Sequence, residues 1–303
     1  MISGRTLFIL VGDSLDRFVV EHECIRAGRQ HELYNATHTL HNTSANKNFY
    51  CRADSNGDGW LNIMHNGLGL NDCAFGAPND DALRNVRRTL TGILAKDSAL
   101  PIGFTQIYVQ IHTGLWDLYA MQPRVCPATA RMLENGSYPA SWLRTARRDF
   151  VEPVLEAIAA HSSWHRHRVR PTLLWRTMPF MCRRFAQRQD PTPYANALSA
   201  LGVRLACDGG LAIADWGAAA CANLNQSAML PDALHFRPAG SAIFAATTRK
   251  AAMRQHHDAR ACSGCSLGMQ CKQRTCLRNY NAPFYALPNV TLSIAWPQSE
   301  VCG

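Results

Sequence analysis

Long apolar runs are absent from this chain of 303 residues. No stretch of about 18 consecutive apolar residues occurs, which excludes a transmembrane helix of ordinary length. Residues 1–11 carry an apolar segment that is too short for a secretory leader, and we expect it to form a strand instead. Two interpretations stay open: the sequence lacks the native start of the protein, with its signal peptide or membrane anchor, or the protein is cytosolic.

Lysine is also scarce, and arginine supplies 27 of the 31 basic residues behind the formal net charge of +9. Arginines cluster at positions 144, 147 and 148, at 166, 168 and 170, and at 183, 184 and 188. Such clusters can attract an anionic polysaccharide, a sialylated glycan or a phosphorylated acyl donor; the alternative is a solvated, arginine-rich surface. No nucleic-acid-binding module accompanies the charge, so we exclude that partner.

A calcium loop is present only in part. Residues 54–61 follow the first eight positions of an EF-hand loop, but His65 stands at the twelfth position, where a bidentate glutamate belongs. The flanking helices are missing as well. We therefore expect a polar turn that leads into a strand, and no metal site.

Cysteine, by contrast, is abundant. The chain has 12 cysteines, and five of them lie in residues 256–303, which show no clear period. Five Asn-x-Ser/Thr sequons begin at Asn35, Asn42, Asn135, Asn225 and Asn289. Both signals favour an oxidising, glycosylating compartment, so we expect disulfides rather than zinc in the tail, with the pairing open. The expected location is the secretory pathway, either the Golgi lumen or outside the cell.

Apolar periodicity predicts alternating strands and helices along most of the chain. We expect strands at residues 6–11, 60–65, 104–111, 169–175 and 211–214, and helices at 15–29, 80–95, 141–161, 193–205 and from 238 onward. This alternation indicates right-handed crossovers and a parallel sheet. We therefore predict one α/β domain over residues 1–255, with a Cys-rich extension at 256–303 packed on it.

Two short motifs together supply a nucleophile, a base and an acid. Gly12, Asp13 and Ser14 follow the first strand and begin a helix, whose positive N-terminus suits a nucleophilic oxygen and an adjacent oxyanion. Asp232 and His235 lie between two prolines, so a rigid turn can hold the carboxylate against one ring nitrogen while the other faces Ser14. The pattern favours a Ser-His-Asp catalytic triad.

These segments resemble the GDSL or SGNH hydrolase superfamily. Four segments look more narrowly like its PC-esterase branch, which includes trichome birefringence-like polysaccharide O-acetyltransferases and the sialic acid O-acetyltransferase domain: residues 12–17, 113–117, 174–177 and 232–236. The resemblance spans roughly residues 5–250. It implies a three-layer α/β/α sandwich with a mostly parallel sheet, and acyl-ester chemistry through an acyl-serine.

The expected oxyanion hole departs from the superfamily pattern. Gly114 begins the segment where a Gly-x-Asn-Asp motif would fall, but Trp116 occupies the asparagine position. Gly69 and Asn71, in a segment that matches the motif after the second long strand, are the expected substitutes for an N–H and an amide donor; a glycine-rich turn is the alternative. Arg17, one helical turn beyond Ser14, can reach the oxyanion or an acidic substrate group; the alternative is a solvated side chain.

The sequence thus predicts a serine-dependent carbohydrate O-acetyl esterase or O-acetyltransferase that needs no metal or organic cofactor. Its partners would be a glycan acceptor or ester, with an acetyl donor as co-substrate in the transferase case. The alternative is a catalytically weak glycan-binding protein with the same fold, which Trp116 and the arginine clusters favour.

Overall fold

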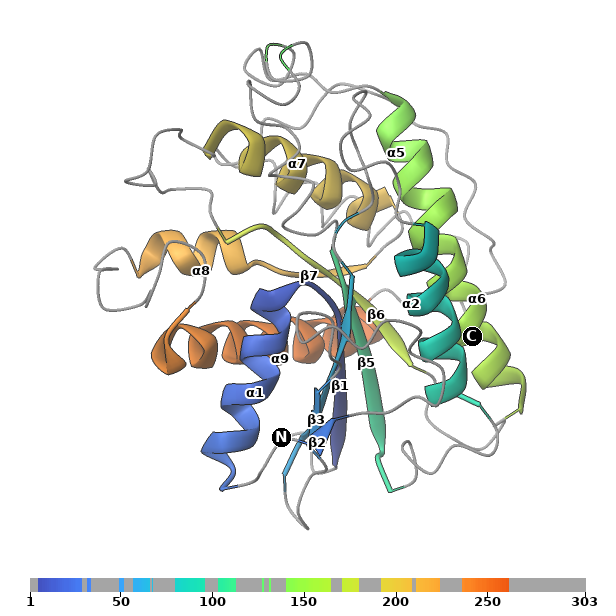
Figure 1. Ribbon diagram of the computed structural model, residues 1–303, viewed down its shortest axis with the longest axis vertical. Helices are drawn as coiled ribbons and strands as arrows, with labels where there is room; N and C mark the ends of the chain where they lie inside the picture. The colour runs from blue at the N-terminus through green and yellow to red at the C-terminus, as the bar shows by residue number, and fades with distance from the viewer. Residues whose placement is uncertain are drawn as a thin grey trace.

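A seven-stranded sheet forms the centre of the molecule (Figure 1). The computed structural model describes residues 5–28, 32–33, 49–51, 57–65, 67, 80–95, 103–112, 127, 131, 140–164, 171–179, 192–208, 211–223 and 236–261. The strands are β1 (Thr6–Gly12), β2 (Glu32–Leu33), β3 (Phe49–Cys51), β4 (Gly59–Met64), β5 (Gln106–Ile111), β6 (Thr172–Arg176) and β7 (Ala212–Ala214).

Most of the sheet is parallel. The strand order is β2-β3-β4-β1-β5-β6-β7, and all pairs from β4 to β7 are parallel. The two short strands β2 and β3 add an antiparallel edge beside β4. The expected mostly parallel sheet is therefore confirmed.

Helices cover both faces of the sheet. They are α1 (Ser14–Arg26), α2 (Asp80–Ile93), α5 (Ala140–Ala146), the π-helix η1 (Arg147–Val151), α6 (Glu152–Trp164), α7 (Thr192–Asp208), α8 (Trp216–Ala222) and α9 (Pro238–Ala261). Helix α1 packs against α9, and α2 packs against α6. Figure 1 shows α1 on one side of the strands, with α2 and α6 on the other. The fold is the expected three-layer α/β/α sandwich.

Burial explains why the first strand is continuously apolar. Leu7, Ile9 and Val11 face one side of β1, while Phe8 and Leu10 face the other, and all five are almost fully buried. A central parallel strand loses water from both faces, so neither face favours polar residues. The apolar run at residues 6–11 therefore predicts a strand, but it does not show which side chains face which side of the sheet.

Three features of the fold were not predicted. Strands β2 and β3 have two and three residues, too few for a periodic pattern to show. Helix α8 has only seven residues, mostly small ones. The expected helix at 141–161 is interrupted by η1, where an extra residue widens the turn without altering the apolar content of the sequence.

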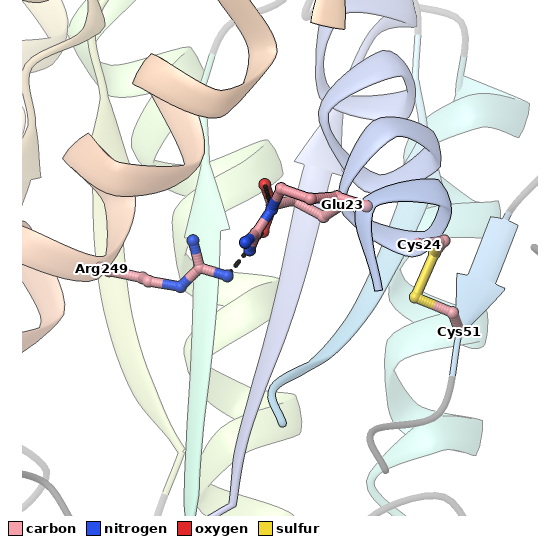
Figure 2. The surroundings of a disulfide bond; sticks show 5 residues. Glu23, Cys24, Cys51 and Arg249 are labelled. Atoms are coloured by element: carbon pink, nitrogen blue, oxygen red, sulfur yellow. Dashed lines mark hydrogen bonds and ion pairs between the residues drawn. A yellow bond between two sulfur atoms is a disulfide. The ribbon is translucent and has the colours of Figure 1, made fainter. Parts of the chain in front are cut away.

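The first helix is covalently tied to the antiparallel edge of the sheet. Cys24 at the end of α1 forms a disulfide with Cys51 of β3 (Figure 2). Cys207 and Cys221 each take part in a disulfide as well, so every cysteine in the described part of the chain is oxidised. The cysteines of the 256–303 segment lie outside the described residues, whereas α9 runs on to Ala261.

The last helix holds the first helix by charge. Arg249 of α9 donates to Glu23 of α1 and to Asp58 just before β4, and its guanidinium lies 4.8 Å from the Trp60 ring centroid. Figure 2 shows Arg249 reaching toward Glu23 while Cys24, the next residue, faces β3. Asp58, inside the partial EF-hand segment, is thus ion-paired with α9. None of the helices in the described ranges is long and apolar enough to cross a membrane.

Candidate active site

The sheet offers one obvious place for a site. After β1 the chain forms β2, β3 and β4 on one side of β1, and it then crosses to β5 on the other side. In open parallel sheets, ligands bind beyond the carboxyl ends of the strands where the strand order reverses in this way. The residues that end or follow β1, β4, β5 and β6 meet at this edge.

The turn after β1 places Ser14 at the first position of α1. Asp13 is the N-cap, and its carboxylate accepts a hydrogen bond from Leu15 N at 2.8 Å. The Asp16 carboxylate in turn accepts from Asp13 N at 3.2 Å, which completes a reciprocal capping box. The turn that carries Ser14 is therefore fixed from both sides.

Gly12 allows the strand to approach this turn closely. A Cβ atom at Gly12 would collide with the Asp16 carboxylate and with the His112 ring. Both groups are fully buried and held by other contacts, so neither can move aside cheaply. Glycine is required here because of this close approach.

Asp16 accepts hydrogen bonds from three side chains on or next to two strands, β5 and β6. Arg176, the last residue of β6, donates from Nη2 to Asp16 Oδ2 at 2.5 Å, and His112 Nε2 lies 2.8 Å from the same oxygen. Gln110 Nε2 of β5 reaches Oδ1 at 3.4 Å. Burial alone would raise the pKa of Asp16, but Arg176 and His112 outweigh it and lower that pKa below its usual value.

Asp13 joins the same group of charges. Its Oδ2 lies 3.6 Å from His112 Nε2 and 3.7 Å from Arg176 Nη2, and Arg176 Nη2 also lies against His112 Nε2. We call Asp13, Asp16, His112 and Arg176 the buried charge cluster. Asp13, Asp16 and His112 are close enough to hold a cation, and the Arg176 guanidinium already supplies a positive charge to both carboxylates.

A second layer of contacts supports the cluster. The Arg176 guanidinium lies 4.4 Å from the Trp216 ring centroid. Trp216 Nε1 donates to Thr248 Oγ1, which donates to Gln110 Oε1, and the Gln110 amide then reaches Asp16. Helices α8 and α9 therefore help to orient a carboxylate on α1 through a continuous polar chain.

His65 follows β4 and lies next to the cluster. Its backbone N–H donates to Gly12 O at 2.8 Å, and its ring centroid lies 5.6 Å from that of His112 and 5.0 Å from that of Phe150 in η1. Neither ring nitrogen has a hydrogen-bond partner of good geometry among the described residues, although Val11 O lies near enough to favour the charged form. Burial and the neighbouring His112 lower the pKa of His65 to about 3.

The described residues contain part of the predicted site. Ser14 begins α1 at the expected edge, and Arg17 lies one turn along with its guanidinium 5.1 Å from the Phe18 ring centroid. Asp232, His235, Gly69, Asn71, Gly114 and Trp116 lie outside the described residues. Phe236, which follows His235, lies just before α9 and packs edge-on against Phe244 within α9. Gly67, between β4 and the predicted donors, has a φ of 140°, which favours glycine.

Four residues of the candidate site were not predicted as site residues from the sequence: Asp16, His65, His112 and Arg176, although Arg176 lies in the 174–177 segment that carries the resemblance. A signal for three of them is present, because each ends or directly follows a strand whose other residues are mainly apolar. Asp16 has a separate signal, since it stands three residues after an N-cap aspartate, where a reciprocal cap is formed.

The fold is that of a doubly wound α/β protein, and its candidate site lies at the switch point of the sheet. No family model matches the chain, and no curated protein matches it by sequence.

The chain is similar in structure to several hydrolases. An α/β hydrolase enzyme from the metagenome of Lake Arreo, Spain, has 13% identity and a TM-score of 0.40 over 83% of this chain and 96% of that chain. The acetylxylan esterase Axe2 from Geobacillus stearothermophilus has 12% identity and a TM-score of 0.38 over 83% and 96%. The acetyl xylan esterase AlAXEase has 11% identity and a TM-score of 0.41 over 81% and 98%. With TM-scores below 0.5 these similarities do not define a family, and functional inference rests on the residues of the site.

Proposed function

We propose that this protein is a serine-dependent O-acyl esterase or O-acyltransferase of carbohydrates, with acetyl as the acyl group. The observation that carries the proposal is the position of Ser14. It begins a helix directly beyond a central parallel strand, at the switch point of the sheet, in a turn fixed by a capping box. The residues around it resemble the PC-esterase branch at 12–17 and at 174–177, where Arg176 reaches the same turn.

In the proposed reaction, Ser14 Oγ attacks the acyl carbonyl carbon while His235 takes the Ser14 proton. The tetrahedral intermediate then expels the sugar oxygen, which receives that proton from His235, and an acyl-serine remains. Asp232 orients the imidazole. A water molecule or a second sugar hydroxyl attacks the acyl-serine by the reverse sequence, which gives hydrolysis or transfer respectively.

The helix terminus supports oxyanion binding at the proposed site. The N–H groups of the first turn of α1 point toward the carboxyl edge, and the helix dipole favours negative charge there. Asp13 accepts the N–H groups of Leu15 and Asp16. The superfamily that the segment resembles assigns the Ser14 N–H to the oxyanion. Gly69 or Asn71 would complete the hole, and Arg17 would contact an acidic group of the substrate.

The proposed location is the secretory pathway or the extracellular space. Four cysteines in the described ranges are oxidised, and two of them, Cys24 and Cys51, are buried between α1 and the sheet. Disulfides of this kind persist in oxidising compartments. The five sequons favour the same location.

Two measurements on one pair of proteins test the enzyme proposal. We expect the wild-type protein to hydrolyse p-nitrophenyl acetate and to be labelled by a fluorophosphonate at Ser14. The Ser14→Ala variant should lose both, with turnover reduced by at least about 1,000-fold. Thr105→Ala is the matched control, because Thr105 carries a hydroxyl at the amino end of β5, on the opposite edge of the sheet.

Equal, slow turnover by the wild type and Ser14→Ala, with no label on Ser14, would contradict the enzyme proposal and favour a glycan-binding protein. If Ser14 reacts, acetate release is compared with acetyl transfer to glycan acceptors to separate esterase from transferase. His235→Ala and Asp232→Asn then test the assigned base and its partner, with a larger loss expected for His235→Ala.

A further inference from the structure

Two buried carboxylates lie beside the proposed nucleophile. Asp13 precedes Ser14 and Asp16 follows it by two residues, and both side chains are shielded from water. Attack by Ser14 creates negative charge on the tetrahedral intermediate within the same turn. Uncompensated carboxylates so close to Ser14 would oppose that charge, and more strongly because they are shielded from water.

Arg176 supplies a cation to both carboxylates. Its Nη2 contacts Asp16 at 2.5 Å and lies 3.7 Å from Asp13, while His112 contacts Asp16 from β5. Arg176 is itself fully buried and lies over Trp216, so it is fixed in one orientation. The positive charge is thus held in place before any substrate arrives.

The same contacts determine the position of the turn. Asp16 accepts a hydrogen bond from the backbone of the N-cap Asp13. It is also bonded to β6 through Arg176 and to the end of β5 through His112. Arg176 lies 160 residues from Asp16 in sequence, so this ion pair ties the first turn of α1 to the far half of the sheet. The position of the Ser14 turn therefore depends on side chains from β6 and the end of β5, and not on backbone hydrogen bonds between strands alone.

We propose that Arg176, acting through Asp16 and supported by His112, is a positioning residue for Ser14 that also neutralises the two carboxylates beside it. This role rests on the proposed function of Ser14. Arg176 contacts the reacting atoms only through the Asp13–Asp16 turn, so its effect belongs to the chemical step rather than to substrate affinity.

Several polar groups in the described ranges face Asp16. Asp13 lies in the same turn, and Gln110 comes from β5, which His112 directly follows. Arg176 comes from β6, and the neutral His65 follows β4. From α9, Thr248 acts only through Gln110. Arg176 is the group in this set whose loss leaves a fully buried carboxylate without its guanidinium.

The test compares three variants at the cluster with one control. Arg176→Met should lower kcat for p-nitrophenyl acetate by about 100-fold and slow the fluorophosphonate labelling of Ser14 by a similar factor, with KM changed by less than about 3-fold. Arg176→Lys should recover part of the loss because it restores the charge. Arg176→Met/Asp16→Asn should exceed Arg176→Met in labelling rate, because it removes the uncompensated carboxylate.

Arg249→Met is the matched control, since it removes an arginine with two carboxylate partners at α9 while leaving the Ser14 turn intact. It should label at the wild-type rate. Urea unfolding of the Asp16 and Arg176 single and double variants measures their coupling without any substrate.

The outcomes separate the two proposals. If wild-type Ser14 reacts and Arg176→Met reacts equally fast, or if the double variant is no faster than Arg176→Met, the positioning role is wrong and the proposed function stands. If wild-type Ser14 does not react at all, both are wrong, whatever coupling unfolding reveals. A higher KM for Arg176→Met with an unchanged kcat also overturns the positioning role.

Discussion

At the scale of single residues, His65 combines full burial with an unfavourable charged form. It is 1% exposed, and its neighbours include His112 and the aromatic ring of Phe150. Burial and His112 lower its pKa to about 3, so the ring is neutral in the folded protein at neutral pH. In the unfolded chain the same imidazole titrates near its ordinary pKa of about 6.5.

This difference predicts a loss of stability in mild acid. Between about pH 6.5 and 3 the unfolded chain binds a proton at position 65 that the folded protein excludes, so stability falls as the pH falls, on the order of 1 kcal/mol per pH unit. His65→Gln should reduce the slope of the free energy of unfolding against pH between pH 7 and 5, measured by urea titration at each pH. His22→Gln is the control, with a smaller effect because His22 is only partly buried. An unchanged slope in His65→Gln would contradict the prediction.

The sequence reveals the candidate nucleophile but not the charges behind it. Ser14 was predictable because its tripeptide follows an apolar strand and carries its own cap. The cluster was not, because Asp16, His112 and Arg176 come together only through the strand order β1-β5-β6. Local patterns give the order of strands along the chain, whereas their order in the sheet depends on packing. The roles of Asp232 and His235 stay predictions.

At the scale of elements, α1 is fixed at both ends by different interactions. Its first turn has the capping box and the buried charge cluster. Its last turn has the Cys24–Cys51 disulfide, and Glu23 accepts from Arg26 and Arg249, which outweigh burial and lower the pKa of Glu23. The helix was predictable from its pattern, but its ties to β3 and α9 were not, since neither the pairing of Cys24 nor that of Glu23 follows from spacing.

Removing the disulfide should destabilise the protein without disabling the Ser14 turn. Cys24→Ala/Cys51→Ala opens a loop of 27 residues, which should lower the free energy of unfolding by about 3 to 4 kcal/mol. Ser14 lies at the opposite end of α1, so fluorophosphonate labelling of the folded variant should proceed at the wild-type rate. Ile25→Ala, at an exposed neighbouring position, serves as the control. A midpoint of urea unfolding equal to that of the wild type would contradict this expectation.

At the scale of the whole molecule, α9 completes the core. Phe244 of α9 is fully buried, stacks on Trp216 and meets Phe236 edge-on. The helix also contacts α1, β6, β7 and α8, so it joins the first element of the chain to the last strands of the sheet. The expected helix after residue 238 was correct, but its length to Ala261 and its contact with α1 required the structure.

Truncating Phe244 should therefore weaken the molecule as a unit. Phe244→Ala leaves a cavity between α8, α9 and the sheet and should lower the free energy of unfolding by about 3 to 5 kcal/mol. Phe244→Leu should cost less because it fills more of the space. Far-ultraviolet circular dichroism and tryptophan fluorescence should follow the same unfolding curve for each variant. Separate transitions for the two signals would show that α9 is not part of the cooperative unit.

The pairing of Arg249 with Glu23 also constrains how the chain folds while it is being made. The two residues are 226 positions apart, so α1 leaves the ribosome long before its partner helix exists. Until then, the face of the sheet that α9 covers is open to other chains and to chaperones. The disulfide between Cys24 and Cys51 needs only the first strands and can form early. Oxidation during synthesis would thus hold α1 at the edge of the sheet until α9 arrives.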